Sequence, residues 1–361
     1  MNKITYALIG CGRISPNHIA AAIANKEKLD LIAICDIDTE RIDIIKNQFN
    51  LDDSVKTYTD YHEMLKEHKP QLVAIATNSG DHGVIALDCI EAGANLIIEK
   101  PIALSLEDAD KIIAKADEKG VKVCACHQNR FNKSIQKIHS AVEEKRFGRI
   151  FHATAHIRWN RGKEYYDQAK WRGTWAQDGG ALMNQCIHNI DLLRWMMDDE
   201  IDEVVAYTDN LAHDFIEAED LGIALIRFKN GGYGIVEGTT NIYPKNLEET
   251  LYLFGEKGTV KAGGKSVNII EEWRFADETE SPEEIKAEFS ENPPNVYGFG
   301  HTPLYEDVID SIINNHAPFV DAHAGRRALE LVLAIYKSAA EGKAVKLPLT
   351  DTKTTDFVGR F

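Results

Sequence analysis

Two groups of residues in this sequence could move a proton. The first is Lys100, in the stretch IIEKPIA, where a run of strand-forming apolar residues ends in Glu99 and Lys100 and meets Pro101 at once. Because a residue before proline disfavours helical geometry, Lys100 should stay extended and direct its ammonium group away from the strand end. A solvated surface lysine is the alternative, and the position alone favours neither interpretation.

The second group lies in the segment GGALMNQCIHNIDLLRWMM, residues 179–197. Asn184, His188 and Asp191 have the spacing i, i+4 and i+7, which places them on one face of a predicted helix. The segment contains no lysine or glutamate, so it should be largely buried, where polar groups need hydrogen-bond partners. Histidine titrates near neutrality, so His188 suits general acid–base catalysis; a hydrogen-bonded core histidine is the alternative.

A glycine fingerprint near the N-terminus indicates a dinucleotide. Residues 10–15 read G-x-G-x-x-S, so Gly10 allows a tight turn and Gly12 lets the backbone approach a pyrophosphate at a helix N-terminus. Asp36 ends the next apolar run, and its carboxylate can bridge ribose hydroxyls but would repel a 2′-phosphate. This pattern predicts NAD rather than NADP. The alternatives are a plain glycine-rich turn and, for Asp36, a helix N-cap, a role that Asp38 fits better.

A parallel sheet is needed to bring these residues together, and the first third of the sequence predicts one. Continuous apolar runs alternate with helical patterns, which is typical of strands buried on both faces of a doubly wound sheet. Ligands of such sheets lie at the carboxyl ends of the strands, so Thr77, Asn78 and Glu99 should face the cofactor with Lys100. Strands are expected at residues 3–10, 30–36, 71–77, 95–100 and 121–126, and helices at 13–26, 39–48, 80–92 and 105–119.

A different pattern begins near residue 127, with longer strands and a hairpin signal at Gly231-Gly232. The sequence therefore predicts an α/β protein with an N-terminal doubly wound parallel (Rossmann) sheet in residues 1–126. A C-terminal α+β domain with a large, mostly antiparallel sheet is expected in residues 127–361, for substrate binding and oligomerisation. Its strands are expected at residues 150–159, 201–209, 219–228, 232–240, 249–254 and 258–262, and its helices at 133–146, 179–197, 302–316 and 324–341.

The composition narrows the class further. A formal charge of −16 over 361 residues argues against binding to nucleic acid or to an anionic membrane. No signal-peptide pattern and no apolar run near the roughly 18 residues of a membrane helix is present, so a cytoplasmic protein is expected. The six cysteines lack zinc or redox spacing, and the histidines lack metal-binding spacing, so reduced thiols and no metal are expected.

Taken together, residues 10–15, Glu99-Lys100-Pro101 and the helix with Asn184 and His188 resemble the Gfo/Idh/MocA oxidoreductases. The resemblance covers essentially the whole chain. The segments 165–197, 246–260, 298–309 and 325–339 are similar to one branch, the UDP-N-acetyl-2-amino-2-deoxyglucuronate 3-dehydrogenases of bacterial surface-polysaccharide synthesis. The resemblance implies that Lys100 and His188 are the catalytic pair. Many family members have aspartate four residues before that histidine, so Asn184 here should position the substrate by hydrogen bonds.

The branch implies NAD-dependent oxidation of the sugar C3 hydroxyl to a ketone, in lipopolysaccharide (O-antigen) precursor synthesis, by a homotetramer. A UDP-sugar is the expected substrate, and a 2-oxo acid that reoxidises NADH is left open. Alternatives are a dehydrogenase of another nucleotide sugar or a free polyol, and a non-catalytic NAD-sensing regulator. The basic and aromatic residues between 158 and 175 could meet the diphosphate, the sugar carboxylate and uracil, or could form a loop that packs on itself.

These expectations give two sets of site residues besides the catalytic Lys100, His188 and Asn184. The expected cofactor residues are Gly10, Gly12, Arg13, Ile14, Asp36, Thr77, Asn78, His82, Glu99, Lys100, Gln128, Trp171 and Arg172. The expected substrate residues are Lys100, Arg158, Asn160, Tyr165, Trp175, Asn184, His188 and His301.

Overall fold

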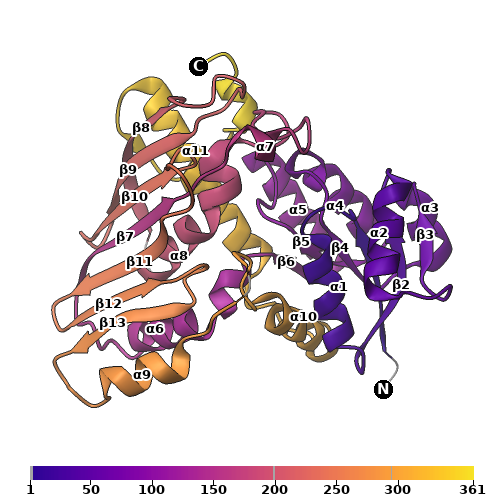
Figure 1. The fold of residues 1–361 in the computed structure, drawn as a ribbon, viewed down its shortest axis with the longest axis horizontal. Helices are drawn as coiled ribbons and strands as arrows, with labels where there is room; N and C mark the ends of the chain where they lie inside the picture. The colour runs from indigo at the N-terminus through magenta and orange to yellow at the C-terminus, as the bar shows by residue number, and fades with distance from the viewer. Residues whose placement is uncertain (1–2, 198–199, 294) are drawn as a thin grey trace. The chain divides into compact units, whose positions relative to one another are not determined.

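The computed structural model describes residues 3–197, 200–293 and 295–361, and Figure 1 labels their helices and strands. The chain forms two compact units. The first comprises Met1–His127 and His301–Arg326, and the second comprises Gln128–Gly300 and Arg327–Phe361. The chain leaves the first unit after His127, whereas the sequence places a boundary after residue 126. Residues 301–326, which the sequence assigns to the second domain, pack with the first unit. None of the helices in the described ranges is both long and apolar enough to cross a membrane.

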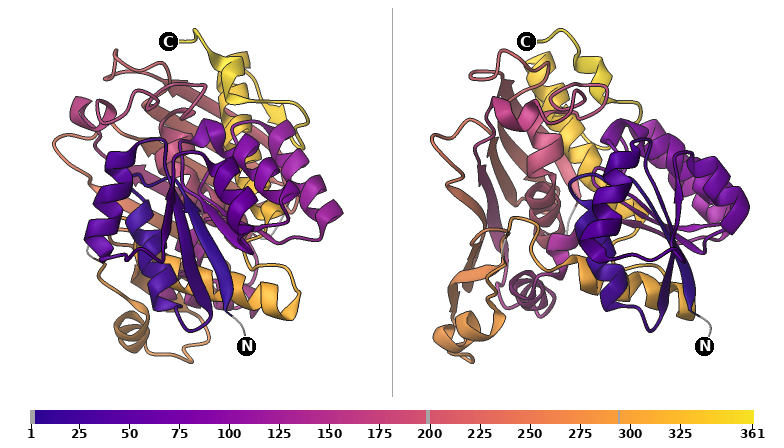
Figure 2. Two further views of the ribbon diagram at one scale, coloured as in Figure 1. Left: turned by 90° about the vertical axis from the view of Figure 1, so that its right-hand side faces the viewer. Right: turned by 45° about the vertical axis from the view of Figure 1, so that its right-hand side comes forward.

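The first unit is built on six parallel strands in the order β3-β2-β1-β4-β5-β6, with helices on both faces of the sheet (Figure 2). This confirms the predicted doubly wound parallel sheet. The strands are β1 (Ile4–Ile9), β2 (Leu29–Cys35), β3 (Lys56–Tyr58), β4 (Leu72–Ile75), β5 (Asn95–Ile98) and β6 (Val123–Ala125). The helices are α1 (Ser15–Ala24), α2 (Thr39–Phe49), α3 (Tyr61–His68), α4 (His82–Glu91), α5 (Leu106–Lys119) and α10 (His301–Asn314).

The strand order of this sheet determines where a ligand can bind. Every side chain of β4 and nearly every side chain of β1 is buried, as the continuous apolar runs predict. The chain order reverses between β1 and β4, so the loops after these two strands diverge to opposite faces of the sheet. Ligands of open α/β sheets bind in the crevice that such a reversal creates at the carboxyl ends of the strands. The loops that begin at Gly10 and Ala76 therefore border the expected cofactor crevice.

The second unit is built on eight strands in the order β13-β12-β11-β7-β10-β9-β8-β14. Among the described strand pairs of this second sheet, only β7 and β10 are parallel, which confirms the predicted mostly antiparallel sheet. The strands are β7 (Ile150–Arg158), β8 (Ile201–Asp209), β9 (Leu221–Phe228), β10 (Tyr233–Thr239), β11 (Glu248–Gly255), β12 (Gly258–Gly263), β13 (Ile269–Phe275) and β14 (Val345–Lys346). The helices are α6 (Lys133–Glu143), α7 (Lys163–Tyr166), α8 (Ile187–Met197), α9 (Pro282–Phe289) and α11 (Ala322–Glu341).

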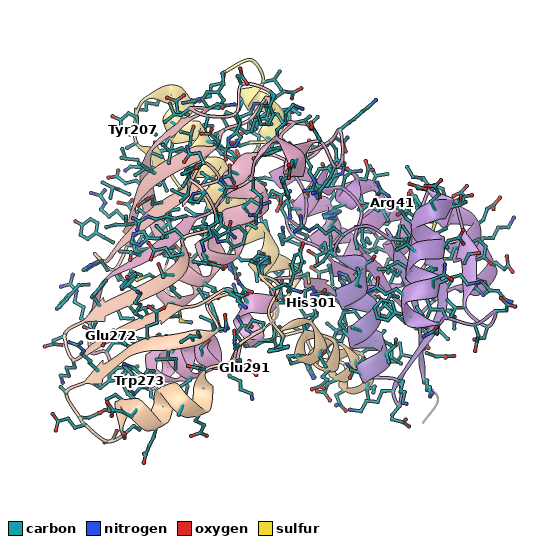
Figure 3. All side chains as sticks on the ribbon, in the orientation of Figure 1. Arg41, Tyr207, Glu272, Trp273, Glu291 and His301 are labelled. Carbon is teal, nitrogen blue, oxygen red and sulfur yellow. The ribbon has the colours of Figure 1, made fainter. Side chains whose placement is uncertain are left out.

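The two faces of this sheet differ. Helices α8 and α11 cover one face, and no helix of the second unit's described residues covers the other face (Figure 1). Side chains alternate between buried and exposed along β8 and β9, as expected for strands with one face toward a core. Large apolar side chains stand on the open side, and Tyr207, marked in Figure 3, is 79% exposed. The open face therefore exposes large apolar side chains.

Candidate active site

The loop after β1 has the shape that a pyrophosphate requires. Gly10 has φ +99°, and a Cβ on it would lie 2.5 Å from the carbonyl carbon and oxygen of Ala76, so another residue would not fit this turn. A Cβ on Gly12 would meet nothing within 4 Å, so the loop is open on that side. The Ser15 hydroxyl donates to the Gly12 carbonyl at 2.6 Å as α1 begins. The loop therefore leads directly to the N-terminus of α1, where backbone N–H groups bind anions.

Asp36 is joined to this loop. Its Oδ2 accepts a hydrogen bond from the Cys11 backbone N–H at 2.7 Å, and its Oδ1 accepts from the Asp38 N–H at 2.9 Å. Asp38, rather than Asp36, caps α2, because the Asp38 carboxylate accepts from the Glu40 N–H. The helix-cap alternative for Asp36 is thereby removed. Its carboxylate holds the end of β2 against the glycine loop, where a ribose would lie.

The ends of β4 and β5 are tied together by His82. Its Nδ1 lies 2.8 Å from the Pro101 carbonyl and its Nε2 lies 3.3 Å from the Thr77 carbonyl. Burial lowers the pKa of His82, so the neutral ring has one N–H, and the shorter contact indicates that Nδ1 donates it. Beside it, the Asn78 amide donates to Asp81, while its Oδ1 is buried and has no hydrogen-bond partner among the described residues. That oxygen is an acceptor available to a ligand.

Lys100 follows Glu99, whose side chain is almost completely buried. The Lys100 backbone N–H donates to Glu99 Oε2 at 3.2 Å, and Glu99 Oε1 lies 3.1 Å from His18 Nε2. Burial alone would raise the pKa of Glu99, but the hydrogen bond from His18 and the charges of His18 and the nearby His301 outweigh it and hold that pKa well below its usual range. Glu99 is therefore a carboxylate that fixes the backbone at Lys100, and Lys100 itself remains partly exposed.

In the second unit, the polar helix is irregular where Asn184 lies. Leu182–Cys186 forms a π-helix, and α8 continues from Ile187. Asn184, Gln185 and His188 are partly exposed although their neighbours are buried. The π-helix widens the turn and so changes the direction of the residues along it, which is frequent at functional sites. The helix presents Asn184, Gln185 and His188, but not Asp191, at an accessible surface.

Asp191 has a structural partner instead. Its carboxylate accepts two hydrogen bonds from Arg130, Nε to Oδ2 at 2.7 Å and Nη2 to Oδ1 at 2.6 Å, and both side chains are buried. Arg130 also lies over the Trp195 ring at 4.7 Å. This bidentate pair anchors the segment with Gln128, whose Nε2 lies 3.5 Å from His188 Nε2. The pair therefore helps to fix the surroundings of the histidine.

A polar network surrounds Asn184. Its amide donates to Asp178, and its Oδ1 accepts from Gln185 Nε2 at 2.7 Å. The same Gln185 nitrogen donates to the Tyr165 hydroxyl at 2.8 Å, which also accepts from Arg172. These residues border a small hollow whose lining includes Tyr165, Asp178, Asn184 and Gln185. The amide of Asn184 is thus held in one orientation, as a positioning residue requires.

Two arginines stack on the same tyrosine. The guanidinium of Arg172 lies 4.2 Å from the Tyr165 ring centre, and that of Arg161 lies 5.3 Å from it. Arg172 Nε is buried and has no hydrogen-bond partner among the described residues. A buried guanidinium N–H without an acceptor is costly, so this donor is suited to a bound anion.

A buried carboxyl group, that of Glu219, contacts the first residue of the π-helix that contains Asn184. Glu219 Oε1 accepts from the Leu182 backbone N–H at 2.7 Å and lies 2.8 Å from the Tyr336 hydroxyl. Burial raises the pKa of Glu219 to about 8. Glycine is required at residue 180 because a Cβ there would lie 1.8 Å from the carboxylate oxygen Oε2. The turn before the π-helix is therefore built around this carboxyl group.

Comparison with known proteins identifies the fold. A profile described as the oxidoreductase family, NAD-binding Rossmann fold, matches residues 4–127. A profile described as the GFO/IDH/MocA C-terminal domain matches residues 135–261. The chain belongs to the Gfo/Idh/MocA oxidoreductase family. The glycine loop, Asp36 and the buried acceptor of Asn78 fit its cofactor, NAD.

Two solved members of the Gfo/Idh/MocA family are similar along nearly the whole chain. The WlbA dehydrogenase from Bordetella pertussis, in complex with NADH and UDP-GlcNAcA, is 39% identical with a TM-score of 0.90, covering 97% of this chain and 99% of that one. The WlbA dehydrogenase from Chromobacterium violaceum, in complex with the same two molecules, is 37% identical with a TM-score of 0.89 and 97% of both chains covered. A further relative, the myo-inositol 2-dehydrogenase of Thermotoga maritima, is 24% identical over 354 residues, covering 94% of this chain and 97% of its own.

The structure brings together some of the expected Gfo/Idh/MocA site residues and separates others. In the first unit, the expected cofactor residues Gly10, Gly12, Asp36, Thr77, Asn78, His82, Glu99 and Lys100 line the loops after β1, β2, β4 and β5. Arg13 and Ile14 belong to the same glycine loop, with Ile14 at the N-cap of α1. In the second unit, Tyr165, Asn184 and Arg172 join one network, Trp171 packs against Arg172, and Gln128 lies beside His188.

Four expected substrate residues lie in other surroundings. Arg158 forms salt bridges with Glu237 and Glu248 on the neighbouring strands, so its charge is already balanced. Asn160 donates to the Ile242 carbonyl at 2.7 Å and shapes a loop. Trp175 is 1% exposed and packs edge-on against Tyr336 in the core, which agrees with the self-packing alternative for its loop. His301 is buried beside Glu99 in the first unit.

Sequence reasoning missed Gln185 and Asp178 as members of the polar network, whereas Arg161 lies in the basic and aromatic segment that it singled out. The signal for Gln185 was present, because it follows Asn184 directly in a helix without lysine or glutamate. Asp178 carried no spacing signal, since it reaches the network from a loop whose path only the fold determines.

Proposed function

We propose that this protein is an NAD-dependent dehydrogenase that oxidises the C3 hydroxyl of UDP-N-acetyl-2-amino-2-deoxyglucuronate to the 3-keto sugar, in the synthesis of bacterial surface polysaccharide. The observation that carries the proposal is the likeness to two dehydrogenases in complex with NADH and UDP-GlcNAcA, at 39% and 37% identity along 97% of this chain. The inositol dehydrogenase is more distant, at 24% identity.

In this proposal, Lys100 and His188 share the proton chemistry. NAD, when bound, accepts a hydride from the sugar carbon. His188 takes the proton of the C3 hydroxyl, and the Lys100 ammonium group stabilises the negative charge that develops on that oxygen. The roles of the two residues can also be exchanged, because two titrating groups on one hydroxyl are coupled. Asn184, held by Asp178 and Gln185, orients the sugar by a hydrogen bond.

The stacked arginines suit an anionic ligand. Arg172 retains a buried N–H donor without a partner among the described residues, and the Tyr165 ring holds its guanidinium plane in place. Planar guanidinium groups bind phosphate and carboxylate through two N–H groups at once. Arg172 and Arg161 therefore supply the positive charge that a UDP-linked uronic acid requires, in a chain whose formal charge is −16.

Turnover measurements with matched substrates test the assignment. NADH formation is followed by absorbance with UDP-GlcNAcA, with UDP-GlcNAc, which lacks the carboxylate, and with free myo-inositol. We expect turnover with UDP-GlcNAcA and a large loss with each of the others. Faster turnover of myo-inositol would instead assign the polyol activity, which the Thermotoga relative favours. Absence of NADH with every substrate would support the non-catalytic regulator.

Variants of the catalytic pair test the roles. Lys100→Met and His188→Asn should each reduce turnover by roughly 100-fold or more and leave NAD affinity nearly unchanged, because cofactor binding rests on the glycine loop. NAD titration by fluorescence serves as the control. Near-normal turnover in His188→Asn would make this histidine structural and leave Lys100 as the acid–base group.

We further propose a homotetramer that assembles through the open face of the eight-stranded sheet, at the neighbouring strands β7, β10, β9 and β8. Large apolar side chains are exposed on these strands, at Phe151, Val205, Tyr207, Ile223, Leu225 and Tyr233. Val205 lies opposite Leu225 and Tyr207 opposite Ile223 on paired strands, and exposed apolar side chains gathered in this way are typical of a protein interface. Light scattering at micromolar concentration should report a mass of four chains, and Leu225→Glu should reduce it. A monomeric wild-type protein would refute this assembly.

A 2-oxo acid is proposed as the partner that reoxidises NADH while it remains bound. Adding 2-oxoglutarate to enzyme supplied with UDP-GlcNAcA and without free NAD should then sustain turnover. No change on addition would show that NADH leaves after each cycle.

A further inference from the structure

Four potential metal ligands meet inside the first unit. They are His18 on α1, Glu99 after β5, Cys126 after β6 and His301 at the start of α10, where Figure 3 labels it. One donor atom from each lies within 4.8 Å of the others, and all four residues are buried. Within the described part of the chain, no other group of three or more histidine, cysteine, aspartate or glutamate side chains converges in this way.

The two distances from Glu99 Oε1 to the histidine nitrogens are close to the ligand spacing of four-coordinate zinc. Glu99 Oε1 lies 3.1 Å from His18 Nε2 and 3.5 Å from His301 Nε2. Ligands at about 2.0–2.1 Å from a tetrahedral Zn²⁺ are roughly 3.3–3.4 Å from one another. The donor set of two imidazoles, one carboxylate and one thiol is typical of zinc and unsuited to magnesium or calcium, which prefer oxygen ligands.

The surroundings of His18 also resemble those of a metal ligand. Its Nδ1 lies 2.7 Å from the Tyr305 hydroxyl, which lies 2.7 Å from the Tyr6 hydroxyl. Metal-binding histidines almost always use their second nitrogen in a hydrogen bond of this kind, which fixes the ring and its tautomer. Nε2 of His18 is then directed at the centre of the cluster.

His301 supplies an independent observation. It is 4% exposed, and neither ring nitrogen makes a hydrogen bond of normal geometry to any described residue. A buried imidazole without hydrogen bonds is costly, since each unsatisfied polar group loses about 1–3 kcal/mol. The ring nevertheless faces Glu99 Oε1 and lies edge-on to the His18 ring, with 5.3 Å between ring centres. A metal ion between these side chains would satisfy it.

We propose that His18, Glu99, Cys126 and His301 bind one Zn²⁺ in a closed structural site. The inference goes beyond the proposed dehydrogenase activity and does not depend on its substrate. The ion would join four separate stretches of chain and would fasten α10 to α1 and to the ends of β5 and β6. It would also hold the carboxylate whose other oxygen accepts from the Lys100 backbone N–H.

Metal analysis of the untagged full-length protein is the first test. Protein purified without chelator should contain about one zinc ion per chain, as measured by inductively coupled plasma mass spectrometry. After removal of the metal with a chelator, addition of Co²⁺ should give visible d–d bands of tetrahedral strength and a near-ultraviolet thiolate-to-cobalt band. A folded protein that takes up no Co²⁺ would overturn the proposal, and the cluster would then be a buried hydrogen-bond network.

Two variants and one control variant assign the bands to these residues. Cys126→Ser should abolish the thiolate band and weaken Co²⁺ binding by at least about 100-fold, while Cys89→Ser, which changes a buried cysteine of α4 outside the cluster, should change neither. Tyr305→Phe removes the hydroxyl that orients His18 and should weaken Co²⁺ binding by about 10–100-fold with the thiolate band retained. A thiolate band that persists in Cys126→Ser would place the metal elsewhere and refute this site.

Discussion

The buried carboxyl group of Glu219 should make the stability of the second unit depend on pH. Burial raises the pKa of this group to about 8 from an ordinary value of 4.5. The folded protein therefore holds the proton more tightly than the unfolded chain does. The resulting stability is fully present below about pH 4.5 and is lost as the pH rises towards 8. The substitution Glu219→Gln keeps an acceptor for the Leu182 N–H but removes the titration.

The magnitude follows from the difference between the two pKa values. Between the two pKa values, each pH unit changes the free energy of unfolding by about 1.36 kcal/mol. Raising the pH from 5 to 8 should therefore lower the contribution of this carboxyl group to the unfolding free energy by roughly 3–4 kcal/mol. The wild type should therefore lose that much more stability over this range than Glu219→Gln. Solvent screening calls for no discount here, because the side chain is 0% exposed.

Urea unfolding followed by tryptophan fluorescence measures this difference. All five tryptophans lie in the second unit, so the signal reports the unit that contains Glu219. Glu217→Gln, two residues away and exposed, is the matched control and should follow the wild type at every pH. Parallel pH profiles for the wild type and Glu219→Gln would refute the reasoning, because the carboxyl group would then not carry a proton at neutral pH.

Three further changes should have distinct effects. Asp36→Arg should weaken the binding of NAD and strengthen the binding of NADP relative to NAD, because a guanidinium that can pair with the 2′-phosphate replaces a carboxylate directed at the ribose. Unchanged NAD affinity in a fluorescence titration would remove Asp36 from the cofactor site. Arg130→Met should destabilise the second unit by about 3–5 kcal/mol in urea unfolding, because it leaves the Asp191 carboxylate buried without its bidentate partner, and a loss under about 1 kcal/mol would count against that account. The double variant of Lys100→Met and His188→Asn should lose little turnover beyond the worse single variant, and additive losses in steady-state kinetics would show that the two act separately.

The parallel sheet could be predicted from the sequence because its signals are local. The runs that became β1, β2, β4, β5 and β6 are continuous and apolar, and the glycine fingerprint lies where one of them ends. β3 was missed because it has three residues, of which two are exposed, so it carries no buried run. α3 was missed because only Met64 and Leu65 of its eight residues are buried, so it carries little apolar periodicity. The sequence predicted β7 to β12 as longer strands with a hairpin signal at Gly231-Gly232, but β13 was missed because charged residues interrupt it.

The site was less predictable because it depends on contacts between distant segments. The spacing of Asn184, His188 and Asp191 indicated one helix face, but the π-helix at Leu182–Cys186 changes that face, and Asp191 pairs with Arg130 in the interior. Trp175 looks in the sequence like the other aromatic residues of its loop, and only the packing of Tyr336 against it shows that it belongs to the core. His301 lies about 200 residues from Glu99, so no local spacing could indicate their contact.

The return of residues 301–326 to the first unit has a consequence for how the protein is made. The ribosome completes β1 to β6 at residue 125, but α10, which supplies the Tyr305 partner of Tyr6 and His18, begins at residue 301. At about 5–20 residues per second, the nascent sheet waits on the order of 10–30 s with that surface uncovered. A fragment that stops near residue 127 would remain in this state permanently, so an isolated cofactor unit needs residues 301–326 joined to it or supplied as a separate peptide.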